Sequence, residues 1–382
     1  MINIKKNNKT KKILFLSGTR ADFGKIKSLI EKISTDQEFE VAIFVTGMHM
    51  LEKFGYTHYE IDKSRFKNIY KFINQNATDT MDQILAKTVI GLGDYVKEYT
   101  PDLIIVHGDR LEALAGSIVG SLNNILTAHI EGGEISGTID GMIRHAVTKL
   151  SHIHFCSNQQ AKKRLIQLGE NRHSSFVIGS PDIDAMKLNN LPCISIVKEH
   201  YEIDFEKYSV VIFHPVTTDL VNLKKQSKIL CDALVKSKLN YVVIYPNNDP
   251  GHENIIEEYR ISLNNNYFII LPSMRFEYYL SLLKNSDFII GNSSSGIIEA
   301  PYLGVPTINI GTRQHKRSLD NSILNISIET NKILKSIEKM KEFKFMNKTN
   351  FYGNGNSADK FYAILKNKNI WKTQIQKYFV DI

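Results

Sequence analysis

The chain has 382 residues, of which 42% are hydrophobic and 23% are charged, with a formal net charge of +8. This length favours two domains, and the composition excludes a mainly disordered chain. Three widely spaced cysteines, Cys156, Cys193 and Cys231, exclude a disulfide framework and fit a reducing, cytoplasmic compartment. No apolar run approaches a membrane span, and the apolar core 13–16 is too short for a signal peptide.

The positive charge weakly favours an anionic partner, whether nucleotide, nucleic acid or membrane. Five lysines lie within 5–12, but no aromatic residues alternate with them, as a single-strand binder requires. We therefore expect no nucleic-acid and no membrane partner.

Short apolar runs alternate with helical patterns of 10–15 residues, which is typical of βαβ units and parallel sheets. Helical stripes of apolar residues occur at 26–33 and 139–150. Several of the strands are apolar nearly throughout, as strands covered on both faces should be. The strands predicted in the first half are 12–18, 41–47, 102–108, 125–133, 152–158 and 175–180.

The same alternation resumes in the second half, with helical runs at 222–237 and 275–285 and closing helices over 358–376. Between the halves, 180–204 has weak periodicity and carries two prolines. We predict two Rossmann-like, doubly wound parallel-sheet domains that face a cleft, with bounds 1–185 and 186–357. The strands predicted in the second half are 208–215, 241–247, 267–272, 287–293 and 306–311.

Polar, charged and glycine residues follow nearly every predicted strand. In open α/β sheets, ligands bind outside the carboxyl ends of the strands. A purely structural protein would have generic turn residues at these positions, so the pattern indicates a ligand site built from both halves. The main segments are 18–22 (GTRAD), 46–49 (TGMH), 107–110 (HGDR), 129–134 (HIEGGE), 214–219 (HPVTTD), 245–249 (YPNND), 291–296 (GNSSSG) and 311–314 (GTRQ).

Two of these segments favour an anionic ligand. GNSSSG precedes a short helix with Glu299, and its small residues allow backbone N–H groups and hydroxyls to bind phosphate. The alternative is a plain serine N-cap. Pro301 predicts an early end to that helix. Arg20 and Lys25, in and after GTRAD, would lie near the same anion, and Arg313 would bind it from the other domain unless it is a surface residue.

The candidate acids are Asp109, Glu131, Glu134 and Asp140. Glu131 follows an apolar strand, so we expect desolvation to raise its pKa and suit it to proton transfer, although buried carboxylates also act as structural acceptors.

Asp140 either caps its helix, pairs with Arg144, or takes part in chemistry. His214 ends a strand and is an acid or base, a phosphate donor, or structural.

No metal signature occurs: the HExxH motif and Cys/His clusters at ligand spacing are both missing from the sequence. The GxSxG nucleophile motif and the Walker A motif are also missing. We expect no metal and no cofactor.

The motifs TRADFGK, HGDR, HIEGGEISGTIDGMIRHAVTKLSHIHF, HPVTTD, GNSSSGIIEAP and INIGTRQ together resemble the UDP-N-acetylglucosamine 2-epimerase family. Within it they resemble the hydrolysing branch that makes N-acetylmannosamine for sialic acid synthesis. The resemblance covers nearly the whole chain. It implies a two-domain GT-B-like fold, with the last segment, 358–382, packing back on the first domain, and assembly as a homodimer or homotetramer.

The resemblance also implies roles for individual residues. Asp109, Glu131, Asp140 and His214 match catalytic positions of the family. Glu299 would bind the ribose hydroxyls. The residues expected to bind the nucleotide sugar are Arg20, Lys25, His49, Asn247, Ser293, Ser294, Glu299 and Arg313.

The implied reaction removes the C2 proton and UDP from UDP-N-acetylglucosamine to give a glycal, which water then converts to N-acetylmannosamine. The sequence leaves alternatives open. The substrate could be an NDP-2,4-diacetamido-trideoxy sugar of the legionaminic acid pathway, or the enzyme could be a non-hydrolysing epimerase. A GT-B glycosyltransferase would share the nucleotide site but would need an acceptor and would give no free epimerised sugar. A nucleotide-sugar sensor fits less well, because several acids collect in the first domain.

Overall fold

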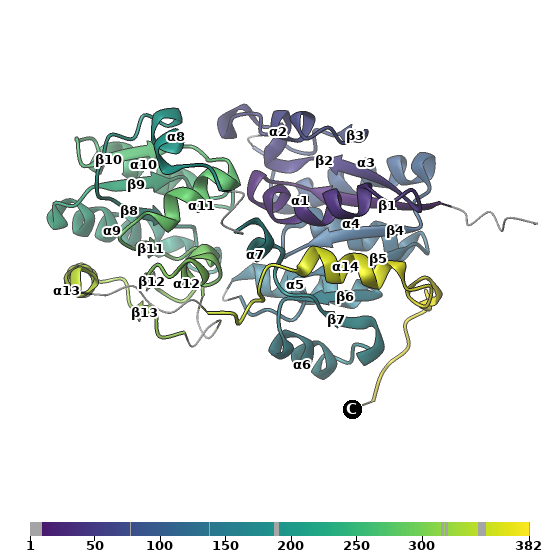
Figure 1. Cartoon of the computed structure of the whole chain (residues 1–382). Coiled ribbons are helices and arrows are strands. Elements are labelled where there is room, and N and C mark those ends of the chain that lie inside the picture. Colours follow the sequence, from purple (N-terminus) through teal and green to yellow (C-terminus); the bar gives the residue numbers. More distant parts are fainter. Residues whose placement is uncertain are drawn as a thin grey trace, which may run out of the picture.

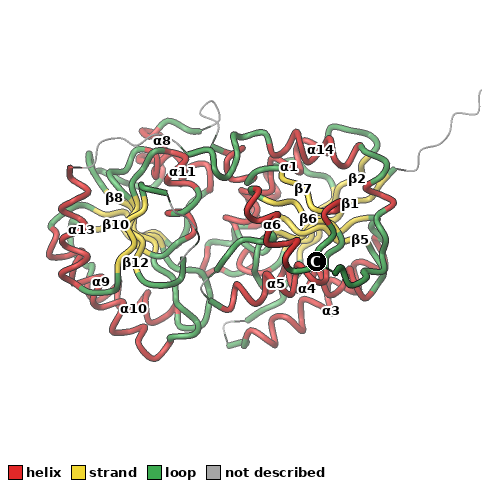
Figure 2. The backbone as a smooth tube through the Cα atoms, turned by 90° about the horizontal axis from the view of Figure 1, so that it is seen from below, coloured by secondary structure: helices red, strands yellow, loops and turns green. Residues whose placement is uncertain are grey.

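Two parallel β-sheets, one in each half of the chain, organise the computed structural model of the protein (Figure 1). The structure describes residues 10–76, 78–136, 138–186, 191–314, 317, 320–342 and 349–381. Each sheet forms its own group of strands with helices around it (Figure 2). Within these residues, no helix combines the length and the apolar character needed to cross a membrane.

The first sheet has seven strands among the described residues, in the order β3-β2-β1-β4-β5-β6-β7, and all neighbours run parallel. The strand order reverses between β1 and β4, which is the kind of point at which open α/β sheets bind ligands. The strands are β1 (Lys11–Ser17), β2 (Phe39–Val45), β3 (Asn68–Lys71), β4 (Leu103–His107), β5 (Leu126–Ile130), β6 (Ile153–Cys156) and β7 (Ser175–Val177).

Helices cover both faces of this sheet. Ile13 and Phe15 of β1 pack in one buried cluster with Leu29, whereas Leu14 packs on the opposite face with Leu92. Both faces of the strand are therefore apolar, as the alternation of side chains along a strand requires. The helices are α1 (Arg20–Ser34), α2 (His58–Lys63), α3 (Met81–Tyr99), α4 (Leu111–Leu122), α5 (Ile139–Leu150), α6 (Gln159–Gln167) and α7 (Pro181–Ala185).

The second sheet repeats this plan with six described strands in the order β10-β9-β8-β11-β12-β13, so its order reverses between β8 and β11. Its strands are β8 (Ser209–Ile212), β9 (Tyr241–Ile244), β10 (Phe268–Leu271), β11 (Ile289–Gly291), β12 (Thr307–Ile310) and β13 (Ile323–Ile326). Its helices are α8 (Ile194–His200), α9 (Leu223–Ser237), α10 (His252–Ser262), α11 (Phe276–Lys284), α12 (Glu299–Leu303) and α13 (Thr330–Glu342).

After the second sheet the chain crosses back to the first. Helix α14 (Ser357–Lys366) runs beside α1, as the yellow ribbon in Figure 1 shows. The ring of Phe361 is fully buried, with its centroid 4.8 Å from that of Phe155 and 6.3 Å from that of Phe15. The C-terminal helix is therefore part of the core of the first sheet.

The residues after α14 hold the end of helix α5. The Lys377 ammonium donates hydrogen bonds to the backbone oxygens of Ser151, at 2.7 Å, and Lys149, at 3.0 Å. A ring nitrogen of His152 lies 2.9 Å from the backbone oxygen of Ile375. A cation stabilises a helix C-terminus, where carbonyl groups have no partner within the helix. The tail thus fixes the far end of the helix that begins at the cavity described below.

The predicted architecture of two doubly wound parallel sheets is confirmed. The sequence analysis missed β3 and β13, which form outer edges of the two sheets. Three of the four residues of β3 are exposed, so the strand lacks the apolar run that reveals a central strand. The first sheet ends at Val177 and the second begins at Ser209; the domain bounds 1–185 and 186–357 stay a prediction.

Replacing Phe361 with alanine is expected to lower the free energy of unfolding by about 3–5 kcal/mol, because the substitution opens a cavity in the core. The single tryptophan, Trp371, packs against the same cluster, so its fluorescence in a urea titration reports the loss. Phe379, with 90% of its surface exposed, is the matched control, and its alanine variant should change stability by less than about 0.5 kcal/mol. Equal effects of the two substitutions would contradict a core role for α14.

Candidate active site

The carboxyl ends of the two sheets border a polar cavity of about 140 Å³. Carboxylates enter it from the loops after β4 and β5 and from the start of α5, while histidine, amide, hydroxyl and guanidinium groups enter from the second half. Its wall includes Lys25, Asp109, Glu131, Asp140, Arg144, His214, Asn247, Ser294, Arg313 and Arg317.

A second cavity, of about 200 Å³, adjoins the first and shares part of its wall, including Lys25, His214 and Asn247. Apolar side chains form much of its remaining surface. The pair therefore offers a charged compartment next to a slot suited to a flat, partly apolar group. The apolar wall of the slot consists of Met48, Ile212, Ile244, Pro246, Pro272, Met274, Phe276 and Tyr279.

All but two of the site candidates named from the sequence line one or both cavities, including Arg20, Ser293 and Glu299 in the second. One exception is the candidate acid Glu134, which is buried and accepts a hydrogen bond of 3.0 Å from Nδ2 of Asn158.

The other exception is His49. Its ring is fully buried, with Nε2 3.0 Å from the Ser17 hydroxyl and Nδ1 2.7 Å from the Thr57 hydroxyl. Burial lowers its pKa to about 4. The structure thus shows His49 bridging β1 and Thr57, the residue before α2, outside the lining of both cavities, so the expected contact with ligand is corrected.

Glu131 is the residue that follows β5 and has the left-handed backbone angle φ of 67°, a conformation that costs energy in residues other than glycine. Its side chain is buried beside Arg144, whose Nη1 donates a hydrogen bond of 2.6 Å to the Glu131 backbone oxygen.

The expected rise in the pKa of Glu131 is wrong. Burial alone would raise the pKa of this carboxyl group. The charges of Lys25, His107 and Arg144 lower it by more than burial raises it, so the pKa is well below its usual value and the side chain is ionised.

Asp109 and Asp140 face the same cavity with opposite pKa shifts. Burial raises the pKa of Asp109, but Arg144, which donates a hydrogen bond to it, and Arg317 lower it below its usual value. For Asp140, burial and the nearby charge of Asp109 together raise the pKa. Carboxyl groups whose pKa values are driven apart are suited to separate base and acid roles.

Neither structural alternative for Asp140 holds. Thr138 is the N-cap of α5, since its hydroxyl accepts a hydrogen bond from the Asp140 backbone N–H at 3.2 Å. Arg144 pairs with Asp109 and Glu131 instead. The carboxylate of Asp140 lies 3.1 Å from Nη2 of Arg313, so it forms an ion pair between the two halves.

His214 is a neutral imidazole at the end of the first strand of the second sheet. Burial and the charges of Arg313 and Arg110 lower its pKa well below its usual value. Its Nδ1 accepts a hydrogen bond of 3.1 Å from the Asn247 backbone N–H, which leaves the proton on Nε2. This neutral N–H group is a donor for an anionic ligand.

The serine segment forms a tight turn. Gly291, the last residue of β11, has φ of 141°, and a Cβ there would lie 1.9 Å from the backbone oxygen of Ile212, so only glycine fits. The Ser293 hydroxyl accepts a hydrogen bond from the Ser295 N–H, as the N-cap alternative predicted. Helix α12 is only five residues long and ends two residues after Pro301, as expected.

The structure adds residues that the sequence analysis did not name as site residues: His107, Arg110, Asp182 and Arg317. His107 and Arg110 lie in HGDR, a segment already singled out as a strand end, so the signal was present. Asp182 follows β7, whose carboxyl end was not examined for chemistry. No motif in the sequence around Arg317 indicated a site residue.

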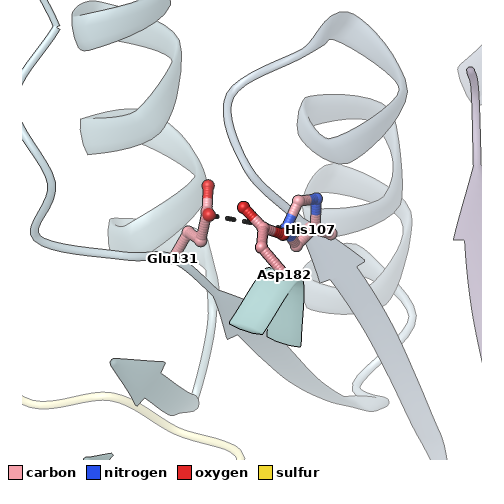
Figure 3. A group of neighbouring side chains, drawn as sticks. All are labelled: His107, Glu131 and Asp182. Atoms are coloured by element: carbon pink, nitrogen blue, oxygen red, sulfur yellow. Dashed lines mark ion pairs between the residues drawn. The ribbon is translucent and has the colours of Figure 1, made fainter. Parts of the chain in front are cut away.

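His107, Glu131 and Asp182 point toward one another from β4, the loop after β5 and the start of α7 (Figure 3). One nitrogen and two oxygens of these residues lie within 4.8 Å of each other, which is a possible metal-ligand spacing. However, the Lys25 ammonium already lies 2.9 Å from the Asp182 carboxylate and so supplies a positive charge there.

The two halves make direct polar contacts around the cavities. Nη2 of Arg110 donates a hydrogen bond of 2.6 Å to the side-chain oxygen of Asn248. Nη1 of Arg20 donates one of 2.9 Å to the Ser273 hydroxyl. These contacts keep the carboxylates of one half and the cations of the other at a shared site.

Comparisons with known proteins give the family. The sequence model described as UDP-N-acetylglucosamine 2-epimerase matches residues 31–366. A UDP-N-acetylglucosamine 2-epimerase of Neisseria meningitidis serogroup B is 43% identical, over 97% of this chain and 99% of that protein. Polysialic acid biosynthesis protein P7 of Escherichia coli is 34% identical, over 97% and 98% of the two chains. UDP-N,N'-diacetylbacillosamine 2-epimerase (hydrolyzing) of Legionella pneumophila is 30% identical, over 93% and 96%.

The fold has solved counterparts. The crystal structure of UDP-GlcNAc 2-epimerase from Neisseria meningitidis bound to UDP-GlcNAc matches with a TM-score of 0.79 and 20% identity, covering 93% of this chain and 100% of that one. This match confirms the predicted GT-B-like fold. The match to the family model over most of the chain, and relatives at 30–43% identity over nearly all of it, show that the chain belongs to the UDP-N-acetylglucosamine 2-epimerase family.

Proposed function

We propose that the protein is a hydrolysing 2-epimerase that converts UDP-N-acetylglucosamine and water into N-acetylmannosamine and UDP, for sialic (nonulosonic) acid synthesis. One observation carries the proposal: acids of the first half and cations of the second half line a single cavity. The names of the Escherichia coli and Legionella relatives support a link to sialic acid polymers and to hydrolysis, respectively.

In this proposal the uracil occupies the apolar slot and the sugar occupies the charged compartment. Glu299, at the start of α12, accepts hydrogen bonds from the ribose hydroxyls. The diphosphate lies between Arg20, Lys25 and Arg313, with the hydroxyls of the serine turn as further donors. Neutral His214 donates its Nε2 proton to a phosphate oxygen. These groups stabilise the charge that develops as UDP leaves.

The first step is an elimination in which a base takes the C2 proton while the C1–O bond breaks and UDP departs. We assign the base to Glu131 because its carboxylate is ionised and buried at the cavity wall. The C2 proton becomes acidic only as the leaving group departs, so a carboxylate suffices. The negative diphosphate also offsets the charge of Lys25 and thereby raises the pKa of Glu131 in the complex.

The second step hydrates the glycal. Burial and the charge of Asp109 raise the pKa of Asp140. When the diphosphate engages Arg313 and removes the ion pair of Asp140, this carboxyl group takes up a proton and gives it to C2 on the face opposite Glu131. Asp109 takes a proton from the water whose oxygen bonds to C1, and that proton then replaces the one lost by Asp140. Because the C2 proton stays on Glu131 until it is released, each turnover yields N-acetylmannosamine, UDP and one proton.

A hydrolysing 2-epimerase of an NDP-2,4-diacetamido-trideoxy sugar is the second candidate, favoured by the Legionella relative at 30% identity. It would use the same chemistry and differ in the groups that contact C4 and C6 of the sugar. A non-hydrolysing UDP-N-acetylglucosamine 2-epimerase is the third, in which UDP returns to the glycal.

The reaction is tested by incubating the full chain with UDP-N-acetylglucosamine in D2O and following products by NMR. We expect free N-acetylmannosamine with deuterium at C2 and one UDP per sugar, because the proton delivered to C2 comes from solvent-exchanged groups. UDP-N-acetylmannosamine would identify the non-hydrolysing reaction. Turnover of a diacetamido sugar nucleotide alone would identify the second candidate.

Replacing Glu131 with glutamine is expected to lower kcat by about 10²- to 10⁴-fold or more, because the amide cannot accept the C2 proton. UDP affinity, measured by calorimetry, should stay within about threefold, since the amide keeps the shape of the side chain. Glu258 of α10 is a buried glutamate that lines neither cavity, and Glu258→Gln serves as the matched control with unchanged turnover. Near-normal turnover of Glu131→Gln would remove this residue from the mechanism.

Chelation with EDTA is expected to leave kcat unchanged. The Lys25 ammonium, 2.9 Å from Asp182, supplies a positive charge to the cluster that has metal-ligand spacing. The measurement compares UDP release before and after EDTA treatment, with and without added Mg²⁺ or Mn²⁺. Loss of activity on chelation that either ion restores would show that a metal takes part.

A further inference from the structure

Arg20 lies in the wall between two cavities. On one side it lines the apolar slot, and on the other it lines a cavity of about 420 Å³, here called the rear cavity, which is bordered by α1, α2 and the start of α11. Glu60 of α2 and Arg275, the residue before α11, line the rear cavity but not the slot. A group that holds Arg20 from the rear cavity can therefore fix its guanidinium without occupying the place of a ligand.

The Arg20 guanidinium is held at both of its terminal nitrogens. Nη2 lies 2.9 Å from Oε1 of Glu60, and Nη1 donates its hydrogen bond to the Ser273 hydroxyl. That hydroxyl donates in turn to the backbone oxygen of Phe54 at 3.3 Å. Because a guanidinium is planar, contacts to both terminal nitrogens fix its orientation as well as its position.

Glu60 also binds a second arginine. Its Oε1 accepts a hydrogen bond of 3.2 Å from Nε of Arg275, whose guanidinium carbon lies 5.4 Å from the centre of the Tyr278 ring. The backbone N–H of Arg275 donates to the Tyr201 hydroxyl at 2.9 Å. Two guanidinium groups share one carboxylate, so the three side chains keep a net charge of +1. Glu60 thus anchors Arg20 to a fixed partner and leaves positive charge available for an anion.

Another ion pair at the rear cavity shows what is special about Glu60. Nζ of Lys27, in α1, lies 2.9 Å from Oε1 of Glu277, in α11, and the two side chains are 32% and 36% exposed. Neither residue lines the slot or the polar cavity. Exposed pairs of this kind contribute little. Of the two carboxylates, Glu60 is the one that binds a residue of the slot wall.

We propose that Glu60 is a positioning residue that holds Arg20 in place for the diphosphate of the substrate. The inference rests on the proposed function, in which Arg20 binds that diphosphate. Without Glu60, the long Arg20 side chain would be ordered only when the ligand binds, and this ordering weakens binding. Glu60 acts through Arg20 and does not touch the ligand. Uracil and ribose, which the proposed function assigns to the slot and Glu299, do not depend on it.

The experiment measures binding of UDP and of uridine to the full chain carrying Glu60→Asp. Aspartate keeps the negative charge but is shorter by one methylene group, so it cannot maintain both arginine contacts. We expect the Kd of UDP, from calorimetry, to rise about five- to tenfold, and the Kd of uridine, from NMR titration, to stay within about twofold. Glu277→Asp makes the same change at the pair with Lys27 and is the matched control, with both affinities unchanged.

Equal losses of UDP and uridine affinity in Glu60→Asp would overturn the inference, since they would show that Glu60 only maintains the shape of the slot. Unchanged or tighter UDP binding would overturn it too. Failure of the proposed function has different signs, which appear in the wild type. The unmodified chain would then bind UDP no more tightly than uridine, or would release no free epimerised sugar.

Discussion

The burial of carboxylates next to the cavity is possible only because cations lie beside them. Removing an ionised carboxylate from water costs several kcal/mol unless good pairing compensates for it. Arg144 supplies this compensation for two acids, through a hydrogen bond to the carboxylate of Asp109 and an ion pair of 3.7 Å with that of Glu131. Lys25 does the same for Asp182. The register of α5 and α1 against the sheet is therefore set by charge as well as by apolar packing.

The same charges also join the two halves. Arg313 of the second half pairs with Asp140 of the first, and Lys25 of the first lies 3.8 Å from Glu299 of the second. In the proposed function, the diphosphate of the substrate would be attracted to these cations and would compete with the carboxylates for them. The same charges would then serve both ligand binding and contact between the halves.

Much of this site could be predicted from the order of strands and the residues that follow them, because parallel strands bring their carboxyl ends to one edge. That rule located Asp109, Glu131 and His214. It failed for His49, since a residue after a strand can also turn inward and bond to the core, as His49 does with Ser17 and Thr57.

The pKa of Glu131 could not be predicted either. The apolar residues before Glu131 indicate burial, which raises its pKa. The cations that lower the pKa again come from α1, α5 and the end of β4, far from Glu131 in the sequence. The edge strand β3 was missed for a related reason. Most of its residues are exposed, so its own sequence has no apolar run that would reveal its pairing with β2.

The contact of Lys377 with the end of α5 has a genetic consequence. A premature stop codon between positions 373 and 377 would leave helix α14 and every side chain of both cavity walls encoded, yet the product would lack the clamp on the helix that carries Asp140 and Arg144. A comparison of motifs alone would find such an allele intact, although α5 would have lost the contact that holds its C-terminal end, the end opposite the cavity.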